Sequence, residues 1–333
     1  MGSQYVVEPF RHVDGEGVAH LFTEVYGDKY PFQMVYHREE LIRAVDEGAC
    51  FPFCVRTASG RVIGYGSLYR SAPFPGIYEF GQGLVSPDFQ GAGLGRLLFE
   101  FVEGYLPTLP GAQVYFGEAV CNHTHTQKAG ANIKTIETGL EIDLMPGYVY
   151  GAGENAPKRV AAVDMFRTFV PRPHIVYLPE VYEDIMRSIY EGFDDGRTLC
   201  LSLDAHQAGA TKMSTRVFDF AQVARISVPV AGEDFLDCLE EEERCLRGRN
   251  IRVTQVWLSL ASPAIGRAVD ALRMRGYFFG AVCPRWFDDD GLLMQRIDGE
   301  PDWGNVRLYS PRTEKIFGVI HEDWQSVARE EEE

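Results

Sequence analysis

In the first half of the chain, segments with the apolar pattern of strands alternate with segments whose apolar residues have helical spacing. Runs of apolar, β-branched and aromatic residues bounded by turn residues predict strands at 5–9, 51–57, 61–71, 76–85, 111–120, 137–145 and 160–170. Helical spacing of the apolar positions predicts helices at 14–26 and 37–48 and from Gly93 to Leu106, with a short helix after the polar loop that begins at Cys121. Strands that alternate with helices in this way predict an α/β unit over residues 1–171.

The second half has a similar order of elements. The prolines of 171–179 predict a linker without regular structure, and a helix is expected over 180–193. Strands are expected near 216–219, 224–230, 251–260, 281–286 and 292–297, with helices at 234–246 and 262–275. Ser262 and Pro263 suit the start of the last helix. This order repeats that of 76–170 without clear residue identity, which leads to the hypothesis of an internal structural repeat.

The length of 333 residues favours two domains, which we expect at 1–171 and 172–333. The acidic tail at 330–333 is expected to be disordered. The formal net charge of −16 argues against nucleic acid as a partner and favours cationic partners such as amines. Seven scattered cysteines without paired metal spacing predict free thiols and a reducing compartment. No signal peptide and no long apolar run is present, so we expect a cytoplasmic protein without a membrane partner.

The stretch from Leu84 to Leu106, "LVSPDFQGAGLGRLLFEFVEGYL", places three glycines at the start of a helix. The first N–H groups of a helix have no partner within the helix and carry a partial positive charge, so they can hold an anion. Gly91, Gly93 and Gly95 leave those amides uncovered, and Gln90 adds an amide side chain. This pattern predicts a pyrophosphate site. The alternative is a tight strand-to-helix turn with close packing.

The same stretch resembles the acyl-CoA-binding motif of the GNAT superfamily of N-acetyltransferases, V-x-P-x-x-(Q/R)-G-x-G-x-(G/A)-x-x-L. The matching positions are Val85, Pro87, Gln90, Gly91, Gly93, Gly95 and Leu98. The order of elements over 1–170 is also similar to that of the family. The resemblance implies a GNAT-type fold, a mixed and mostly antiparallel sheet flanked by helices. Residues 216–297 resemble a second, smaller and degenerate GNAT-like α/β unit, which lacks the phosphate loop.

The resemblance implies acetyl-CoA, or another acyl-CoA, as the cofactor. The strand at 111–120 would splay from the strand at 76–85 to admit it. The residues expected to bind it are Leu84, Val85, Gln90, Gly91, Ala92, Gly93, Leu94, Gly95, Arg96 and Asn122.

Acyl transfer to an amine needs a base for the ammonium proton and an acid for the leaving thiolate. Glu79 and Glu118 in apolar strands and His123 in the polar loop are the catalytic candidates, with outward-facing strand positions and a plain polar loop as the alternatives. The family's usual acid is a tyrosine, but the frame N-x-x-A-x-x-x-Y laid on Asn122 puts Ala129 there. We expect no metal site.

Tyr78 and Tyr115 are candidates for lining an acceptor pocket or for the core. The acidic turn at 288–290 has too few regularly spaced oxygens for Ca²⁺ and is expected to be solvated.

These features lead to the hypothesis of an N-acetyltransferase in which a small-molecule or peptide amine attacks the thioester directly. The alternative is an inactive CoA-binding regulatory or scaffolding protein, and an acyltransferase with a hydroxyl acceptor or a bulkier acyl group stays open. The sequence leaves the acceptor, the acyl chain length, the general acid, the oligomeric state and the role of the second half undetermined.

Overall fold

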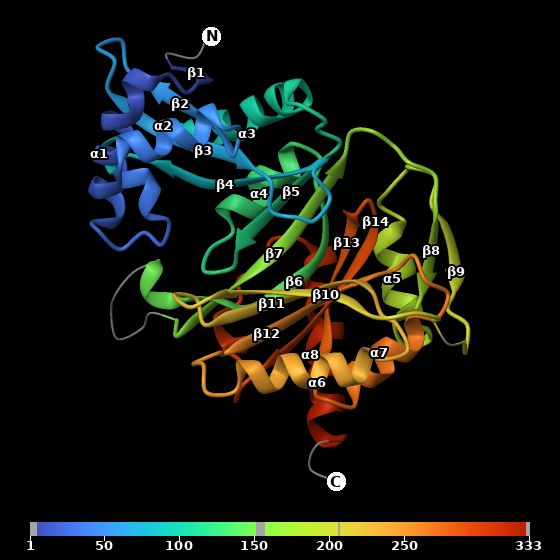
Figure 1. The fold of residues 1–333 in the computed structure, drawn as a ribbon. Helices are drawn as coiled ribbons and strands as arrows, with labels where there is room; N and C mark the ends of the chain where they lie inside the picture. Colours follow the sequence, from blue (N-terminus) through green and yellow to red (C-terminus); the bar gives the residue numbers. More distant parts are fainter. Residues whose placement is uncertain (1–4, 151–156, 206, 331–333) are drawn as a thin grey trace. The chain divides into compact units, whose positions relative to one another are not determined.

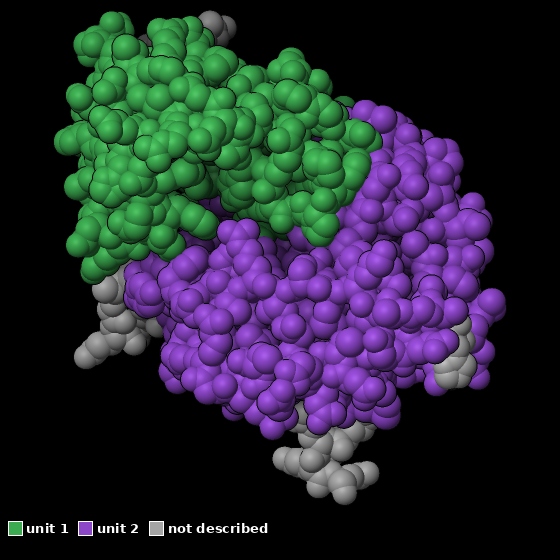
Figure 2. All heavy atoms as spheres, viewed as in Figure 1, with its two compact units in different colours: residues 1–118, 128–135 green, residues 119–127, 136–333 purple. Residues whose placement is uncertain are grey.

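The chain forms two compact units in a computed structural model that describes residues 5–150, 157–205 and 207–330. Unit 1 comprises residues 1–118 and 128–135, and unit 2 comprises 119–127 and 136–333 (Figure 2). The last two residues of strand β5 and the first turn of helix α4 thus belong to unit 2. The division into domains at residue 171 stays a prediction.

Unit 1 is a sheet with helices on both faces (Figure 1). The strands are β1 Val6–Pro9, β2 Cys50–Arg56, β3 Val62–Tyr69, β4 Ile77–Val85 and β5 Val114–Val120, in the order β1-β2-β3-β4-β5. The helices are α1 Gly15–Tyr26, α2 Arg38–Asp46, α3 Leu94–Tyr105 and α4 His125–Asn132. Neighbouring strands are antiparallel except for β4 and β5, which are parallel and connected through α3.

Alternating side chains of the strands create two apolar layers in unit 1. On one face, α1 and α2 bury Leu21 and Leu41 in a cluster with Cys54 of β2. On the other face, Phe53 of β2 contacts Phe101 of α3, with ring centroids 5.0 Å apart. The α3 crossover therefore lies on the face opposite α1 and α2, with its start at the carboxyl end of β4.

Unit 2 is likewise built on both parallel and antiparallel strand pairs. These strands are β6 Ile136–Pro146, β7 Arg159–Thr168, β10 Lys212–Phe218, β11 Val223–Val230, β12 Val253–Ser259, β13 Phe278–Phe287 and β14 Asp289–Ile297, in the order β7-β6-β13-β14-β12-β11-β10. Its helices are α5 Glu183–Tyr190, α6 Phe235–Leu246, α7 Ile265–Arg273 and α8 Pro311–Glu330. The sequence pattern gave no indication of α8.

The hypothesis of an internal repeat has a counterpart in the topology. The β10/β11 pair is antiparallel, and α6 connects β11 to the parallel strand β12. In unit 1 the β3/β4 pair is likewise antiparallel, and α3 connects β4 to the parallel strand β5. The α3 crossover in unit 1 and the α6 crossover in unit 2 thus each connect the two strands of a parallel pair that follows an antiparallel one.

Two local expectations are wrong. Residues 171–179 are not free of regular structure, because β8 Ile175–Leu178 pairs in parallel with β9 Thr198–Leu201. The prolines flank this apolar run instead of interrupting it, so its main chain can still pair. Helix α7 begins at Ile265, and Ser262 lies before it, where its hydroxyl accepts a 3.1 Å hydrogen bond from the Ala264 amide.

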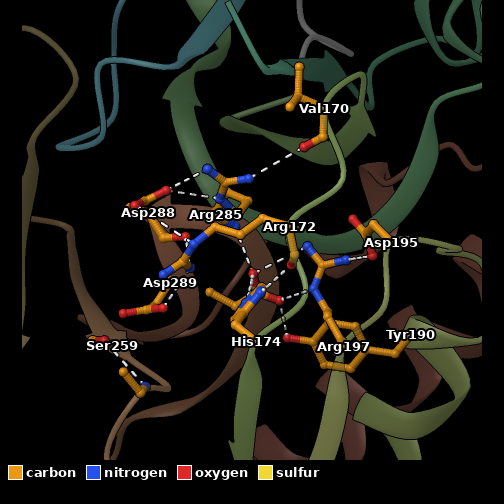
Figure 3. Close-up of polar contacts among 12 residues, drawn as sticks. Val170, Arg172, His174, Tyr190, Asp195, Arg197, Ser259, Arg285, Asp288 and Asp289 are labelled. Carbon is orange, nitrogen blue, oxygen red and sulfur yellow. Dashed lines mark hydrogen bonds and ion pairs between the residues drawn. The ribbon is translucent and has the colours of Figure 1, made fainter.

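The expectation of a solvated acidic turn is wrong at Asp290, which is fully buried. Its carboxylate accepts hydrogen bonds from His174 Nε2 at 3.1 Å, the Tyr190 hydroxyl at 2.8 Å and Arg197 Nε at 2.5 Å (Figure 3). The Arg285 amide adds a fourth donor at 2.8 Å. A buried carboxylate is tolerated because donors surround it, and here they come from the residues just before β8 and β9, from α5 and from β13.

No helix in the described ranges is long and apolar enough to span a membrane. All seven cysteines are free thiols, as the sequence predicted. The expectation of a disordered acidic tail falls, apart from Glu330, on residues outside the described ranges.

Candidate acyl-CoA site

The glycine stretch forms an open loop at the start of α3. A short 3₁₀ turn, Pro87–Phe89, ends β4, and Gln90 is extended. Gly91 and Gly93 have φ angles of 80° and 79°, in the left-handed region where glycine is favoured, and α3 begins at Leu94. The two glycines thus permit the turn by which the chain enters the helix.

Three main-chain amides at the start of α3 are left without helical acceptors. The first helical hydrogen bond is donated by Leu97 to the Gly93 carbonyl at 3.2 Å, so the amides of Leu94, Gly95 and Arg96 have no acceptor within the helix. Residues 90–93, Gly95 and Arg96 are exposed, with the side chain of Arg96 3.4 Å from Glu100 on the helix surface.

A β-carbon placed on Gly91, Gly93 or Gly95 would meet no atom within 4 Å. Close packing therefore does not explain the three glycines. The positive φ angles account for Gly91 and Gly93, but Gly95 has ordinary helical geometry. The open space beside Gly95 leaves room for an anion on the amides.

Strand β4 separates from β5 halfway along its length. The two strands pair at Ile77, Tyr78 and Glu79 only, within the described residues. Leu84 and Val85 pair with Tyr65 and Gly64 of β3 on the other side. The main chain of β4 from residue 80 onward is therefore not paired with β5, as expected for strands that splay apart.

A bulge accompanies this separation. The register of β3 against β4 shifts between Tyr65 and Ser67, and Gln82 of β4 has a φ of 56°. The buried Oε1 atom of Gln82 has no hydrogen-bond partner among the described residues. The sequence analysis missed this bulge, although the glycines on either side of Gln82 are a signal for one.

The two strand carboxylates have different surroundings. Glu79 is buried and accepts a 2.6 Å hydrogen bond from the Tyr69 hydroxyl, which lies on the paired position of β3. Burial and the charge of Glu79 raise the pKa of Tyr69 well above its usual value, with a smaller contribution from Glu118. Glu118 is half-buried in β5. Tyr69 therefore stays protonated as a donor beside both carboxylates.

Tyr69 as the partner of Glu79 is a second feature that sequence reasoning missed. The sequence carried no signal for it, because the pairing of Tyr69 with Glu79 depends on the register of β3 against β4, which contains a bulge. Tyr115 is buried near Glu79. Burial raises the pKa of Tyr115, and the negative charge of Glu79 raises it further. Tyr78 is a core residue, since its buried hydroxyl donates to the Pro110 carbonyl at 2.8 Å.

Asn122 and His123 belong to unit 2, in the turn before α4. Asn122 Oδ1 and His123 Nδ1 are buried without a hydrogen-bond partner in the described part of the chain. Burial and the neighbouring His125 lower the pKa of His123, so its imidazole is neutral at pH 7. Ala129 lies in α4, where the family pattern has tyrosine.

The matching position in unit 2 is closed. The amide of Glu233, just before α6, donates to the Gly209 carbonyl at 3.1 Å, and a β-carbon on Gly232 would collide with that carbonyl. The parallel strands β11 and β12 are paired over six positions from Val223/Val253 onward. Neither the open loop nor the splayed strands of unit 1 are repeated there.

No group of three or more His, Cys, Asp or Glu side chains that could hold a metal ion occurs among the described residues.

The comparison with curated protein sequences gave no match to this chain. Among solved structures, a chimera of spermidine N-acetyltransferase SpeG from Vibrio cholerae and hSSAT is similar at 17% identity. The match covers 50% of this chain and 96% of that chain, with a TM-score of 0.40. The ribosomal-protein-S5-alanine acetyltransferase from Vibrio fischeri is similar at 15% identity, covering 50% and 94%, with a TM-score of 0.40. Similarity at this level says nothing about the acceptor of this chain.

The model of the acetyltransferase (GNAT) family matches residues 16–128. This range includes the glycine loop, the parallel β4/β5 pair and both strand carboxylates. Together with the mixed, helix-flanked sheet, the match agrees with the fold that the motif implied. The match favours an enzyme and gives no support to the alternative of an inactive CoA-binding protein. Residues 16–128 are thus a domain of the GNAT family of acyltransferases, whose acyl donor is acetyl-CoA.

Proposed function

We propose that unit 1 transfers the acetyl group of acetyl-CoA to the nitrogen of an amine by direct attack on the thioester. The observation that carries this proposal is the run of amides without helical acceptors at the start of α3. An anion of two linked phosphates fits such a helix start, because amides and the helix dipole both favour negative charge. The residues proposed to hold it are Gln90, Gly91, Ala92, Gly93, Leu94, Gly95 and Arg96.

The main chain of β4 supports the placement of the pantetheine arm. Its amide groups are strong hydrogen-bonding partners that β5 does not use beyond Glu79. We assign Leu84 and Val85 to this role. Asn122 remains a proposed contact through its buried, unpartnered Oδ1.

Glu79 is the first candidate for the base. An amine attacks only after losing its proton, and a carboxylate in hydrogen-bonding reach, directly or through a water, can accept it. The Tyr69 hydroxyl orients Glu79 through its 2.6 Å hydrogen bond. Because the raised pKa of Tyr69 keeps the hydroxyl protonated, the carboxylate of Glu79 retains its negative charge. As nitrogen bonds to the carbonyl carbon, the C–S bond breaks and the sulfur of CoA takes up a proton.

Glu118 and His123 are the other proposed catalytic residues. Glu118 is half-buried on β5, and its charge acts on Tyr69. The neutral imidazole of His123 can accept a proton near pH 7. An acceptor with a positive charge is favoured by the net charge of −16.

Thiol release from acetyl-CoA in the presence of a panel of amines tests this function. The panel contains polyamines, small monoamines and peptides with a free N-terminus, with a matched panel of alcohols as the control. Amine-dependent thiol release, with the acetylated amine identified by mass, is the expected result. CoA binding without turnover on any amine would instead favour the inactive binding protein, and turnover on alcohols alone would favour an O-acyltransferase.

A further inference from the structure

A pocket of about 420 Å³ lies in unit 2, where α6 ends and β12 begins. Four arginines line it: Arg247 and Arg249 from the segment after α6, Arg252 just before β12, and Arg296 from β14. A cavity of this size can enclose a small organic molecule.

The charge of this pocket is opposite to that of the chain. Four arginines and two carboxylates, Glu243 and Asp298, leave a net charge of about +2 on the lining (4 − 2). The chain as a whole carries −16. A concave surface with a positive charge attracts small anions and raises their local concentration.

The guanidinium groups differ in how far the protein already uses them. Arg296 donates to Glu243 at 2.8 Å, and Arg252 donates to the Glu300 carbonyl at 2.6 Å and to the Asp143 carboxylate at 3.2 Å. Arg249 donates to Asp219 at the surface at 2.8 Å. The guanidinium of Arg247 has no partner in the ranges that the structure describes, so its donors are available to a ligand.

The end of a helix explains only part of this arrangement. Cations are favoured near a helix C-terminus, and Arg247 follows the last residue of α6, its amide bonded to the Glu243 and Arg244 carbonyls. Arg252 precedes β12 and Arg296 lies in β14, however, so the positive charges converge from segments far apart in the sequence. The convergence around a hollow, rather than the helix end, indicates a binding site.

One wall of the pocket is apolar. Ile251, Ile297, Val327 and Trp324 contribute to it. An anion with no organic part would leave this wall in contact with water, whereas an apolar or flat group would cover it.

We propose that this pocket binds a small organic anion with at least two negative charges and an apolar or aromatic part. Phosphate and carboxylate groups share the chemistry that guanidinium recognises. The pocket lies at the start of β12 and the end of α6. The position in unit 2 that corresponds to the glycine loop lies at the end of β11 and the start of α6, so this pocket is not a remnant of a CoA site.

Calorimetric titration with pyrophosphate, ADP and citrate tests the proposal. The titrations use the full chain carrying Gly95→Glu, which places a carboxylate on the proposed phosphate site of unit 1 and so isolates unit 2. We expect binding of at least one probe, weakened about tenfold or more by Arg247→Glu, because one charged donor is lost and a like charge is added. Arg247→Gln, which adds no negative charge, should weaken it less.

Arg267→Glu is the matched control, an exposed arginine of α7 outside the pocket, and it should leave the affinity unchanged. Tighter binding of ADP than of pyrophosphate is expected from the apolar wall. The ratio of citrate to pyrophosphate affinity distinguishes a carboxylate from a phosphate ligand. The proposal is overturned if none of the probes binds at millimolar concentration, or if binding is insensitive to both Arg247 variants.

Discussion

The hydroxyl of Tyr69 donates a 2.6 Å hydrogen bond to Glu79, its cross-strand partner on β4. Glu79 is also the last position at which β4 pairs with β5. A buried and oriented carboxylate thus stands at the point where the two parallel strands separate. Burial would penalise its charge, and the tyrosine offsets that penalty with one strong hydrogen bond.

We expect Glu79→Gln to lower kcat by about 100-fold or more, the usual contribution of a general base, with the KM for acetyl-CoA little changed. Tyr69→Phe should lower kcat by about tenfold, since the carboxylate remains but loses the donor that orients it. Steady-state kinetics over a range of pH measure both effects.

Glu40→Gln, an exposed position on α2, is the control and should have full activity. Equal kcat values for Glu79→Gln and Glu40→Gln, together with a large loss in Glu118→Gln, would transfer the role of base to Glu118.

Gly95→Glu should abolish measurable CoA binding without harming the fold. The position has open space and helical φ, so glutamate adds no strain, and an acidic residue in the first turn favours the helix. Its carboxylate would repel the pyrophosphate. Gly95→Ala is the matched control with near-normal affinity, since it adds only a methyl group. Calorimetry with CoA gives the affinities, and undiminished binding by Gly95→Glu would argue against the site.

Gly93 and Gly95 should respond oppositely to alanine. Gly93 has a φ of 79°, so alanine there should destabilise by about 1–2 kcal/mol. Gly95 is helical, so alanine should stabilise by about 0.5–1 kcal/mol. Urea denaturation followed by circular dichroism measures both, and a Gly93→Ala protein as stable as Gly95→Ala would contradict the left-handed geometry.

The Asp290 cluster makes the stability of unit 2 depend on pH. Burial acts against the charged form of His174, but the hydrogen bond to Asp290, the charge of Asp290 and the hydrogen bond to the Arg172 carbonyl together outweigh it and raise the pKa of His174 above its ordinary value of 6.5. Burial also acts against the charge of Asp290, but His174 and Arg197 together keep the pKa of its carboxyl below 3.8. The charge of Arg197 acts against the charged imidazole, and the Arg172 carbonyl accepts a 2.7 Å hydrogen bond from its Nδ1.

A raised histidine pKa stabilises the fold at low pH, and this stabilisation disappears as pH rises through the folded-state pKa. We therefore expect the melting temperature of unit 2 to fall between about pH 6 and pH 8. A loss of about 1 kcal/mol corresponds to about 2–4 °C at this size. All four tryptophans lie in unit 2, so their fluorescence follows its unfolding. His174→Gln should remove this dependence, and an unchanged slope would refute the assignment.

Much of the secondary structure could be predicted from the sequence, because the spacing of apolar residues that distinguishes strands from helices involves residues only a few positions apart. Each end of β4 and of α3 lies within one residue of its expected position. The prolines around β8 misled the prediction, since proline affects only its own position and the one before it, and the apolar run between them is free to pair. The burial of Asp290 could not be predicted, because its donors come from residues up to 116 positions away.

The sequence by itself determined the glycine loop that we propose as the phosphate site, because an open helix start depends on consecutive residues from Gln90 to Arg96 and on the three glycines among them. It also contained the alternation that produces the mixed sheet. Only the tertiary structure decided that Tyr69 holds Glu79, that β4 parts from β5 after that residue, and that four arginines surround one hollow in unit 2. These relationships depend on strand register and on contacts between distant segments, which folding establishes and local sequence does not encode.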